Sequence, residues 1–555
     1  MRSTSEIITH FRETVGDVPP GLTGASTTVA GSRLYLFGGS LAGGSDRKLS
    51  SDLYALDLDL WKWEKIIPAM GEHAPPARYS HTLDFWRNHL VLYGGLGEQS
   101  SSKRTEVLND VRLFNLTTRR WLRPSRIFHA STVPKARHLH LSCISVDKLF
   151  VLGGKDSSGD ELEEVCVYDL VKKEWIQIQP QLPKLKATCA LVATSQWYVR
   201  TPPQDIDHPD TPMPLRYSER ATSKSPCDMY LYQGNSGQTL DVFSSSSNGK
   251  IAKKSTHHTA QLPSFHSPCG AVLGNSLILA GNHPIDGMNQ TFSIWTFDTN
   301  TTKSVCIDTG DVFQHGSWTH GFLWEVHNKF VVFGKRGEPL GDPSGETVLN
   351  WDAVVVVDLE ALGIYQPPVL KLSTAAQKLG LKSLAGSHHT DFDFICDDGR
   401  RIPCSRKTIF DRWPWLLDQH TRLSSTEASV KHQKRTELTI TKTTLTSSQS
   451  YPVTMALLQY FYSLTLGTAL QRAPAVLSHL LLISTEYYIP HLRALVTHAM
   501  HLALTELTAD GIFEIAAACG CRSLQIRYVF FTWHPHLQHG SRLVSGRSGY
   551  TGREK

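Results

Sequence analysis

The stretch Leu34-Tyr-Leu-Phe-Gly38-Gly39 decides the fold, because it returns twice further along the chain. Leu90-Val-Leu-Tyr-Gly94-Gly95 repeats it 56 residues later, and Leu149-Phe-Val-Leu-Gly153-Gly154 follows after another 59 residues. Each copy is a short apolar strand ending in a glycine pair, and glycine permits positive φ and close backbone approach at a strand end. A strand-and-turn repeat with a period of roughly 50 residues indicates a β-propeller array.

More than the glycine pair repeats. A polar loop, an alternating strand and a tryptophan follow each pair, and period-2 alternation is typical of a half-buried strand. The tryptophans are Trp61 with Trp63, Trp121 and Trp175. The residues that end the alternating strands are Asp57, Asn115 and Asp169. Their side chains suit a turn, and we expect the tryptophans, represented in the first repeat by Trp61, to pack between neighbouring blades.

The repeat resembles the kelch family, strongly over residues 20–180 and more weakly afterwards. The later copies keep only one glycine each, at Gly234, Gly281 and Gly334. We therefore predict an all-β kelch propeller of about six blades over residues 20–368, and the weak copies leave seven blades as an alternative. Propellers present loops to partners, so the resemblance implies protein binding rather than catalysis.

A second motif recurs at the same step. Arg78-Tyr79-Ser-His81 is followed 59 residues later by Arg137-His138-Leu-His140. Arg78, Tyr79, Arg137 and His138 are candidate client-binding residues, because arginine pairs well with a partner carboxylate. The alternatives are a blade-to-blade salt bridge for the arginines and a hydrogen bond to the neighbouring blade's backbone for His81 and His140.

Composition narrows the class of protein. The 555 residues suffice for two or three domains, and a net charge of +5 gives no reason to expect nucleic-acid binding. We find no secretory signal and no membrane-spanning run. The ten cysteines are scattered without a zinc-type pair. We therefore expect a reduced, cytoplasmic protein without cofactor or bound metal.

Two polar stretches interrupt the repeats. Residues 199–227 hold several prolines, and residues 243–258 begin with four serines and carry three lysines. Both are predicted to be exposed loops, disordered in part. Residues 369–388 are predicted to be a linker.

A different pattern begins near residue 389. A short strand, Phe392–Cys396, is followed by the hairpin signal Asp397-Asp-Gly-Arg400, and Ser405 is placed to cap a helix through Phe410. Apolar helices are expected over residues 456–467, ending at glycine, and over residues 477–492, broken by Pro490.

This region resembles a BTB/POZ domain, an α+β protein-interaction module. We assign it residues 389–504, followed by a short helical extension over 505–533 that Thr508 is expected to cap, and by a disordered tail over 534–555. Two departures stand out: Cys404 replaces the family's histidine, and a polar stretch over 418–437 replaces a short segment. Its charged run 431–435 is predicted to be a solvated loop.

The resemblance implies a homodimer through this module, or recruitment of cullin-3. The candidate interaction residues are Phe410, Trp413, Trp415 and Leu416. An exposed group of this kind marks a binding patch, whereas helical spacing favours burial as core. The hydrophobic-x-glutamate element that many cullin-binding members carry is missing after Leu417.

The order of the two regions, kelch first and BTB last, resembles the animal leucine-zipper-like kelch–BTB adaptor and the fungal kelch–BTB regulators of the Ras pathway. The implied function is a non-enzymatic scaffold that acts on a Ras-type GTPase or recruits substrates to a ubiquitin ligase. A cytoskeletal or cell-polarity scaffold is the first alternative. A propeller enzyme similar to galactose oxidase is the second, although the 26 histidines form no repeated copper-type set.

Overall fold

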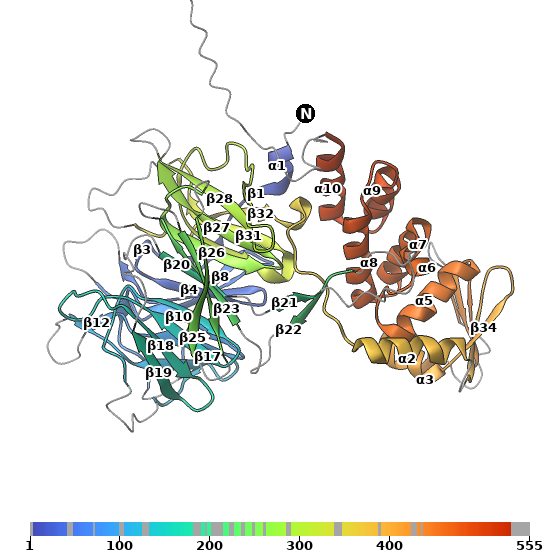
Figure 1. Ribbon diagram of the computed structural model, residues 1–555, viewed down its shortest axis with the longest axis horizontal. Coiled ribbons are helices and arrows are strands. Elements are labelled where there is room, and N and C mark those ends of the chain that lie inside the picture. The colour runs from blue at the N-terminus through green and yellow to red at the C-terminus, as the bar shows by residue number, and fades with distance from the viewer. Residues whose placement is uncertain are drawn as a thin grey trace, which may run out of the picture. The chain divides into compact units, whose positions relative to one another are not determined.

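The protein is described by a computed structural model that divides into two compact units (Figure 1). It describes residues 4–533 except 42–47, 70–72, 99–104, 125–132, 181–189, 195–196, 201–214, 221–226, 235–238, 247–249, 259–261, 285–289, 338–346, 387–389, 423–429 and 434–436. The first unit holds residues 1–198 and 220–359, and the second holds residues 199–219 and 360–555. The predicted disordered tail, 534–555, lies outside the described residues. No helix in the described ranges is long and apolar enough to cross a membrane.

The first unit is built from six antiparallel sheets that follow one another along the chain. The first three consist of β4 (Ser26–Ala30), β5 (Arg33–Phe37), β7 (Leu53–Asp57) and β8 (Lys62–Ile66); β10 (Thr82–Trp86), β11 (His89–Tyr93), β14 (Val111–Asn115) and β15 (Arg120–Trp121); and β16 (Leu141–Ser145), β17 (Lys148–Leu152), β18 (Glu164–Asp169) and β19 (Glu174–Pro180). The fourth and fifth consist of β20 (Ala190–Thr194), β23 (Cys227–Gln233), β24 (Thr239–Ser245) and β25 (Ile251–His258); and β26 (His266–Leu273), β27 (Ser276–Pro284), β28 (Gln290–Asp298) and β29 (Ser304–Cys306). The sixth consists of β30 (Ser317–Trp324), β31 (Lys329–Lys335), β32 (Ala353–Asp358) and β1 (Thr9–Glu13).

The first strands of the six sheets contact one another in order, and β30 of the last sheet contacts β4 of the first. These innermost strands therefore form a ring of six sheets, the arrangement of a β-propeller. The last sheet takes its fourth strand from the N-terminus, because β1 pairs with β32 from Thr9 opposite Val357 to Glu13 opposite Ala353. The unit thus begins before the predicted residue 20, and it ends at residue 359 rather than 368.

The first unit also contains shorter elements in addition to the four main strands of each of these six sheets. They are α1 (Thr4–Ile8), β2 (Val15–Gly16) beside β8, the pair β3 (Leu22–Thr23) and β6 (Ser40–Leu41), the ladder β9 (Arg78–Tyr79), β12 (Leu96–Glu98) and β13 (Thr105–Val107), and the 3-10 turn η2 (Glu325–His327). One further pair, β21 (Trp197–Arg200) and β22 (Tyr217–Arg220), lies where the chain passes between the two units.

Tryptophan packing joins neighbouring sheets, as predicted, but with one change of residue. Trp121 packs edge-on against Phe37 of the preceding sheet at 5.4 Å between ring centroids, and Trp175 packs against Tyr93 at 5.2 Å. In the first repeat this position belongs to buried Trp63, whose ring lies 6.0 Å from Phe333 of the sixth sheet. Trp61, which the sequence analysis chose, is half-buried at a turn with φ of 56°.

The turn residues explain that change. Asp57, Asn115 and Asp169 each accept hydrogen bonds from backbone N–H groups two and three residues later, as predicted. The packed tryptophan then stands six residues after each of them, which selects Trp63 and excludes Trp61.

The lysine-bearing stretch 243–258 is not a loop as predicted. It contains the end of β24 and all of β25, which pair antiparallel, while residues 247–249 of the turn lie outside the described residues. The buried carboxylate of Asp241 binds the Lys253 ammonium at 2.9 Å and the Thr256 hydroxyl at 2.8 Å. The serine run therefore marks a hairpin turn within the fourth sheet.

The second unit combines one mixed sheet with nine helices in its described residues. The sheet order is β34 (Arg401–Cys404), β33 (Phe392–Ile395), β37 (Thr444–Ser447), β36 (Glu437–Ile440) and β35 (Val430–Gln433), with β33 parallel to β37. The helices are α2 (Thr374–Ala385), α3 (Arg406–Arg412), α4 (Pro414–Thr421), α5 (Tyr451–Ser463), α6 (Ala469–Arg472), α7 (Pro474–Glu486), α8 (Pro490–Ala503), α9 (Ala509–Ala518) and α10 (Arg522–Trp533), and the 3-10 turn η3 (Glu360–Leu362) precedes them.

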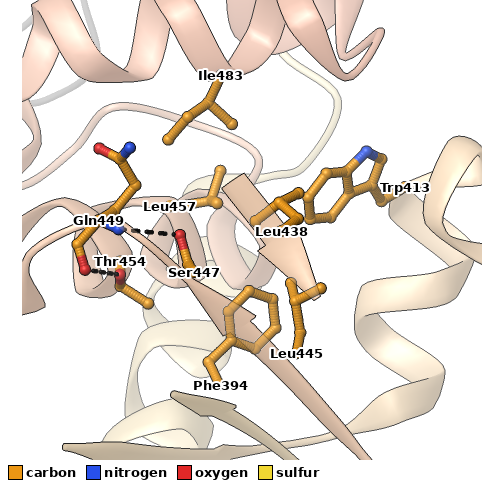
Figure 2. A pocket seen from close by; sticks show the side chains of 9 residues that line it. All are labelled: Phe394, Trp413, Leu438, Leu445, Ser447, Gln449, Thr454, Leu457 and Ile483. Atoms are coloured by element: carbon orange, nitrogen blue, oxygen red, sulfur yellow. Dashed lines mark hydrogen bonds between the residues drawn. The ribbon is translucent and has the colours of Figure 1, made fainter. Parts of the chain in front are cut away.

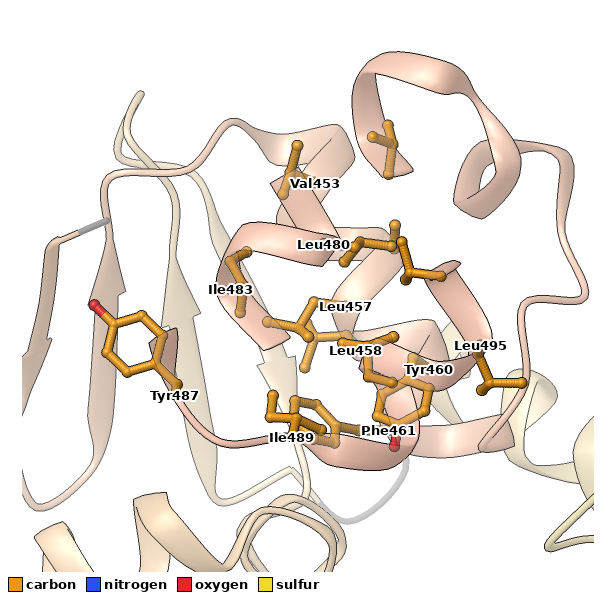
Figure 3. Packing of buried hydrophobic residues seen from close by; sticks show 14 of the residues in the cluster. Val453, Leu457, Leu458, Tyr460, Phe461, Leu480, Ile483, Tyr487, Ile489 and Leu495 are labelled. Atoms are coloured by element: carbon orange, nitrogen blue, oxygen red, sulfur yellow. The ribbon is translucent and has the colours of Figure 1, made fainter. Parts of the chain in front are cut away.

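Helices α5 and α7 supply much of the core of this unit, as the buried side chains of Figure 3 show. The Ser405 hydroxyl caps α3 by accepting a hydrogen bond from the Thr408 N–H, as predicted, and the helix continues to Arg412. Helix α5 does not reach Gly467, because Leu464 adopts the left-handed conformation with φ of 51° and ends it. Thr508 makes no capping hydrogen bond to α9, and part of the predicted charged loop is strand β35.

The predicted linker and part of one predicted exposed loop belong to the second unit. Helix α2 occupies the predicted linker and packs against α5. Leu215 and Tyr217, which lie in the predicted exposed insertion, are buried in the core of the second unit. The neighbouring stretches 201–214 and 221–226 lie outside the described residues.

We expect Trp63→Ala to lower the free energy of unfolding of the first unit by about 3–5 kcal/mol, because it opens a cavity between two sheets. Trp61→Ala, as the matched control, should cost about 1–2 kcal/mol, because its side chain is only half-buried. Urea unfolding of the full chain measures both changes. A larger loss for Trp61→Ala would contradict the assignment of Trp63 to the packed position.

Candidate functional site

The two Arg-x-x-His loops lie against the glycine pair of the preceding sheet. The Arg78 carbonyl accepts a hydrogen bond from the Gly39 N–H at 2.8 Å, and the Arg137 carbonyl accepts one from the Gly95 N–H at 2.9 Å. A Cβ on Gly38, whose φ is 67°, would lie 2.6 Å from that Arg78 oxygen. A Cβ on Gly94 would lie 2.8 Å from the Arg137 oxygen. The glycine pairs are therefore required where one sheet docks onto the next.

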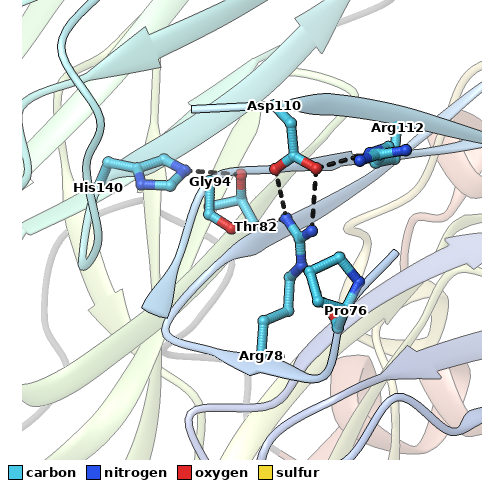
Figure 4. A network of polar contacts seen from close by, with 7 residues as sticks. All are labelled: Pro76, Arg78, Thr82, Gly94, Asp110, Arg112 and His140. Carbon is cyan, nitrogen blue, oxygen red and sulfur yellow. Dashed lines mark hydrogen bonds and ion pairs between the residues drawn. The ribbon is translucent and has the colours of Figure 1, made fainter. Parts of the chain in front are cut away.

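The arginine side chains of these loops are fully buried. Figure 4 shows the polar contacts of the first of them, Arg78. Arg78 binds Asp110 through two hydrogen bonds of 2.8 and 3.0 Å, and it donates another to the Gly94 carbonyl at 3.0 Å. Arg137 binds Glu164 at 2.5 Å and the Gly153 carbonyl at 3.0 Å. These side chains cannot reach a partner as predicted. Each ion pair also lies within one sheet's repeat rather than between two blades.

Burial and neighbouring charges shift the pKa values of the titratable groups beside these arginines. Burial opposes ionisation of Asp110, but the hydrogen bonds and charges of Arg78 and Arg112 outweigh it and lower its pKa. Burial, followed by the Arg78 charge, lowers the pKa of His81 to about 3. Burial and the Arg137 charge likewise hold the pKa of His140 well below its usual range. Both histidines are therefore neutral packing groups, and His140 shares a hydrogen bond of 3.1 Å with the Thr82 hydroxyl of the preceding sheet.

The residues between Arg and His face outward at one end of the innermost strands. The Ser80 N–H donates to the Gly24 carbonyl at 2.8 Å, and the Leu139 N–H donates to the Ser80 carbonyl at 3.1 Å. Equivalent positions of three successive sheets are thus linked around the central axis. We call Tyr79, Ser80, His138 and Leu139 the mouth surface; the side chains of Tyr79 and His138, both predicted, are half-buried there.

Leu139 is the unusual member of the mouth surface. Its φ is 53°, in the left-handed region that disfavours bulky residues, and 45% of its side chain is exposed. Gly24 holds the same position in the first repeat with φ of 63°. An exposed apolar side chain held in a strained conformation is typical of a binding site. The sequence analysis does not single out Leu139. Its position in the repeat matches that of Gly24, which could have indicated a left-handed backbone conformation at Leu139.

In the second unit, most of the predicted aromatic group is core. Phe410, Trp413 and Leu416 are buried, and the Trp413 indole N–H donates to the Tyr487 carbonyl at 3.0 Å. Only Trp415 is partly exposed, with its ring 4.8 Å from that of Tyr487. Burial as core, which the helical spacing favours, is therefore confirmed for Phe410, Trp413 and Leu416, and the alternative of an exposed binding patch is wrong for these three residues.

Tyr488 extends the exposed part of this region. Its side chain is 70% exposed and its φ is 55°, so a second bulky residue is held in the left-handed conformation at a surface. Trp415 packs against Tyr487, the residue before Tyr488 in the chain, and we call the two accessible positions Trp415 and Tyr488 the aromatic surface. Tyr488 follows the buried Tyr487 directly in the chain, which explains why sequence reasoning did not separate the two.

The second unit contains a pocket that is lined mainly by side chains of its core (Figure 2). Its walls are mainly core side chains, among them Trp413, Leu438 and Ile483. Two of its polar groups bind to neighbouring backbone, since the Ser447 hydroxyl accepts from the Gln449 N–H and the Thr454 hydroxyl donates to the Gln449 carbonyl. Across the described part of the chain, no group of three or more His, Cys, Asp or Glu residues could hold a metal ion.

We expect acid to destabilise the first unit through His81 and His140. Their folded pKa values lie below the unfolded value of about 6.5, so the stability of the neutral forms is lost as pH falls below that value. Each histidine should cost about 2 kcal/mol at a pH of about 5. His140→Gln should flatten the fall in unfolding free energy measured by urea titration at several pH values. Exposed His266→Gln is the control, and equal slopes for all three proteins would contradict the prediction.

Parts of the chain are similar in sequence to known proteins. Residues 4–200 match the family model described as "KLHDC2/KLHL20/DRC7 Kelch-repeats domain". The chain is also 23% identical over 592 residues to Protein ral2 of Schizosaccharomyces pombe (strain 972 / ATCC 24843), which covers 95% of this chain and 94% of that protein. The similarity to Protein ral2 therefore extends through both units.

Two other relatives match shorter parts. The Rho GTPase-activating protein gacHH of Dictyostelium discoideum is 33% identical over 111 residues, which are 20% of this chain and 7% of that protein. Host cell factor 2 of Homo sapiens is 28% identical over 195 residues, which are 32% of this chain and 22% of that protein. The family match coincides with the repeated glycine pairs and their sheets, so residues 4–200 contain kelch-type repeats and make up part of the six-sheet unit.

Proposed function

We propose that this protein is a non-enzymatic cytoplasmic adaptor, in which the mouth surface of the first unit binds a client protein and the second unit recruits another protein. The observation that carries the proposal is Leu139, an exposed apolar side chain held in a strained conformation where the repeats meet. The surrounding backbone hydrogen bonds fix its position, so the surface is prepared before a client arrives.

The second unit is proposed to be a BTB/POZ-type module. The hairpin β33–β34, the capped helix α3 and the buried helices α5 and α7 support this assignment, since they follow the order that the resemblance implies. Cys404 replaces the family's histidine. It is fully buried, and its thiol donates to the Phe392 carbonyl at 3.3 Å. The thiol thus links the two strands of the hairpin within the core.

We propose a Ras-type GTPase pathway as the setting. The kelch–BTB order resembles fungal regulators of that pathway, and the similarity to Protein ral2 extends over both units. An adaptor with two binding units acts by proximity, because holding two partners on one chain raises the effective concentration of each near the other. Cullin-3, or a second copy of this chain, is the proposed partner of the aromatic surface.

We expect Leu139→Gly to lower client retention at least about tenfold, because it removes an anchor side chain. The free energy of unfolding should stay the same or rise by about 1 kcal/mol, since glycine adopts the left-handed conformation without strain. Affinity purification of the full chain with mass spectrometry, beside urea unfolding, measures both. The control is Val171→Arg, at an exposed turn between β18 and β19.

The identity of the retained client decides the pathway. A Ras-type GTPase captured by wild type and by Val171→Arg, and lost from Leu139→Gly, supports the proposal. Cytoskeletal or polarity proteins with the same pattern would replace the Ras pathway by the alternative scaffold function. Full retention by Leu139→Gly would show that the mouth surface is not the client site.

We expect Tyr488→Gly to remove the second partner while the client stays bound. Glycine suits the backbone conformation at this position, so the aromatic ring is lost without misfolding. Leu507→Arg, at a 98% exposed position of the same unit, is the matched control. Immunoblotting for cullin-3 and light scattering for the dimer measure the two candidate partners. A second partner that Tyr488→Gly retains would place its binding elsewhere.

A further inference from the structure

A short segment of the chain is buried in the second unit, although the chain before residue 199 and after residue 219 belongs to the first. Residues 215–219, which we call the strap, belong to the second unit, whereas residues 1–198 and 220–359 form the first. The strap reads Leu-Arg-Tyr-Ser-Glu. It lies more than 140 residues before the start of the remainder of the second unit at residue 360.

The strap, whose residues 217–219 are part of β22 and pair with β21, also makes main-chain contacts with residues 368–370. The Ser218 N–H donates to the Pro368 carbonyl at 2.9 Å, and the Leu370 N–H donates to the Ser218 carbonyl at 3.3 Å. Ser218 and Val369 thereby form a parallel β-bridge. Main-chain pairing of this kind is how extended peptides bind along a strand of their receptor.

Three side chains of the strap are buried and two are exposed. Leu215 and Tyr217 are 5% and 3% exposed and belong to the core of the second unit, whereas Arg216 and Glu219 are exposed. The Tyr217 hydroxyl is hydrogen-bonded to the Thr465 hydroxyl at 2.8 Å. The buried Ser218 hydroxyl accepts a hydrogen bond from the Gln366 side chain. Two apolar anchors and two polar contacts thus specify the pattern Leu-x-Tyr-Ser.

The receptor side is contributed by residues that lie far from the strap in sequence. Residues 366–370 supply the main-chain partners and the Gln366 amide, while Thr465 supplies the hydroxyl. The ring of buried His498 on α8 lies 6.4 Å from that of Tyr217, and its Nδ1 is hydrogen-bonded to the Tyr365 hydroxyl at 2.8 Å. Tyr365 and His498 fix each other beside the strap, so part of the receptor wall is organised by contacts that do not involve it.

We propose that the second unit contains a peptide-binding groove for extended segments of the pattern Leu-x-Tyr-Ser, and that the strap is its ligand in cis. The groove combines one extended segment for main-chain pairing at Val369, apolar sites for Leu215 and Tyr217, and hydroxyl and amide partners for the polar atoms. This inference goes beyond the adaptor function and does not depend on it. It concerns a site that neither the mouth surface nor the aromatic surface includes.

Hydrogen exchange of the full chain tests whether the strap occupies the groove. The amides of Ser218 and Leu370 should exchange about a hundredfold more slowly than unprotected amides, because both donate to carbonyls across the strap. Tyr217→Ala should abolish this protection, and Tyr217→Phe should reduce it about tenfold by removing the hydroxyl contact. Arg216→Ala, at an exposed strap position, is the matched control. Unprotected amides in wild type, or full protection in Tyr217→Ala, would overturn the proposal.

Peptide binding in trans tests whether the groove is a site in its own right. The probe is a fluorescent peptide of residues 213–220, added to the full chain carrying Leu215→Ala and Tyr217→Ala. It should bind this double variant at least about tenfold more tightly than wild type, whose groove is occupied. The same peptide with alanine in place of Tyr217 should not bind. Equal binding to both proteins, or none to either, would overturn the proposal.

Loss of solubility in the double variant is decisive as well. If it is insoluble alone, co-expression with the 213–220 peptide should restore soluble protein with the peptide bound. Failure of the peptide to restore it would show that the strap is ordinary core rather than a ligand. The adaptor function would stand or fall separately, because its variants lie at Leu139 and Tyr488.

Discussion

The fold of the first unit depends on how closely each repeat packs against the repeat before it. At each of the first two joints, the carbonyl of an arginine approaches a glycine pair so closely that a Cβ on the first glycine would lie under 3 Å away. The same arginine then turns its side chain inward to bind a carboxylate of its own repeat. One residue thus ties its sheet to the preceding sheet by its backbone and braces its own sheet by its side chain. The loop residues that follow each arginine are therefore held in a fixed position.

What the sequence predicts well is what repeats locally. The glycine pairs, the turn residues Asp57, Asn115 and Asp169, and the Ser405 cap depend on neighbours a few residues away, so their patterns survive without knowledge of the fold. Trp63 was misassigned although its spacing was present, because Trp61 also fitted the looser pattern. Arg78 and Arg137 were recognised as special, but their burial depends on how neighbouring strands pack, which the sequence does not display.

What the sequence could not supply is contact between distant segments. Tyr217 meets Thr465 across 248 residues, and no periodicity links the two positions. The proline-rich surroundings of the strap point to a loop, and only the apolar Leu215 and Tyr217 argue otherwise. The N-terminal strand β1 was missed for the same reason, since its partner β32 lies at the far end of the unit. Pairing over such distances is decided by the completed core.

The two candidate surfaces share a physical feature that argues for function over stability. Leu139 and Tyr488 both hold a large exposed side chain at positive φ, where glycine would cost the fold less. Arg87, Arg119 and Lys173 are also exposed at positive φ, so the backbone conformation alone does not mark a binding site. Among the described residues, Leu139 and Tyr488 are the exposed apolar and aromatic side chains at such positions, one in each unit. This arrangement is the one expected of a protein that holds two partners at once.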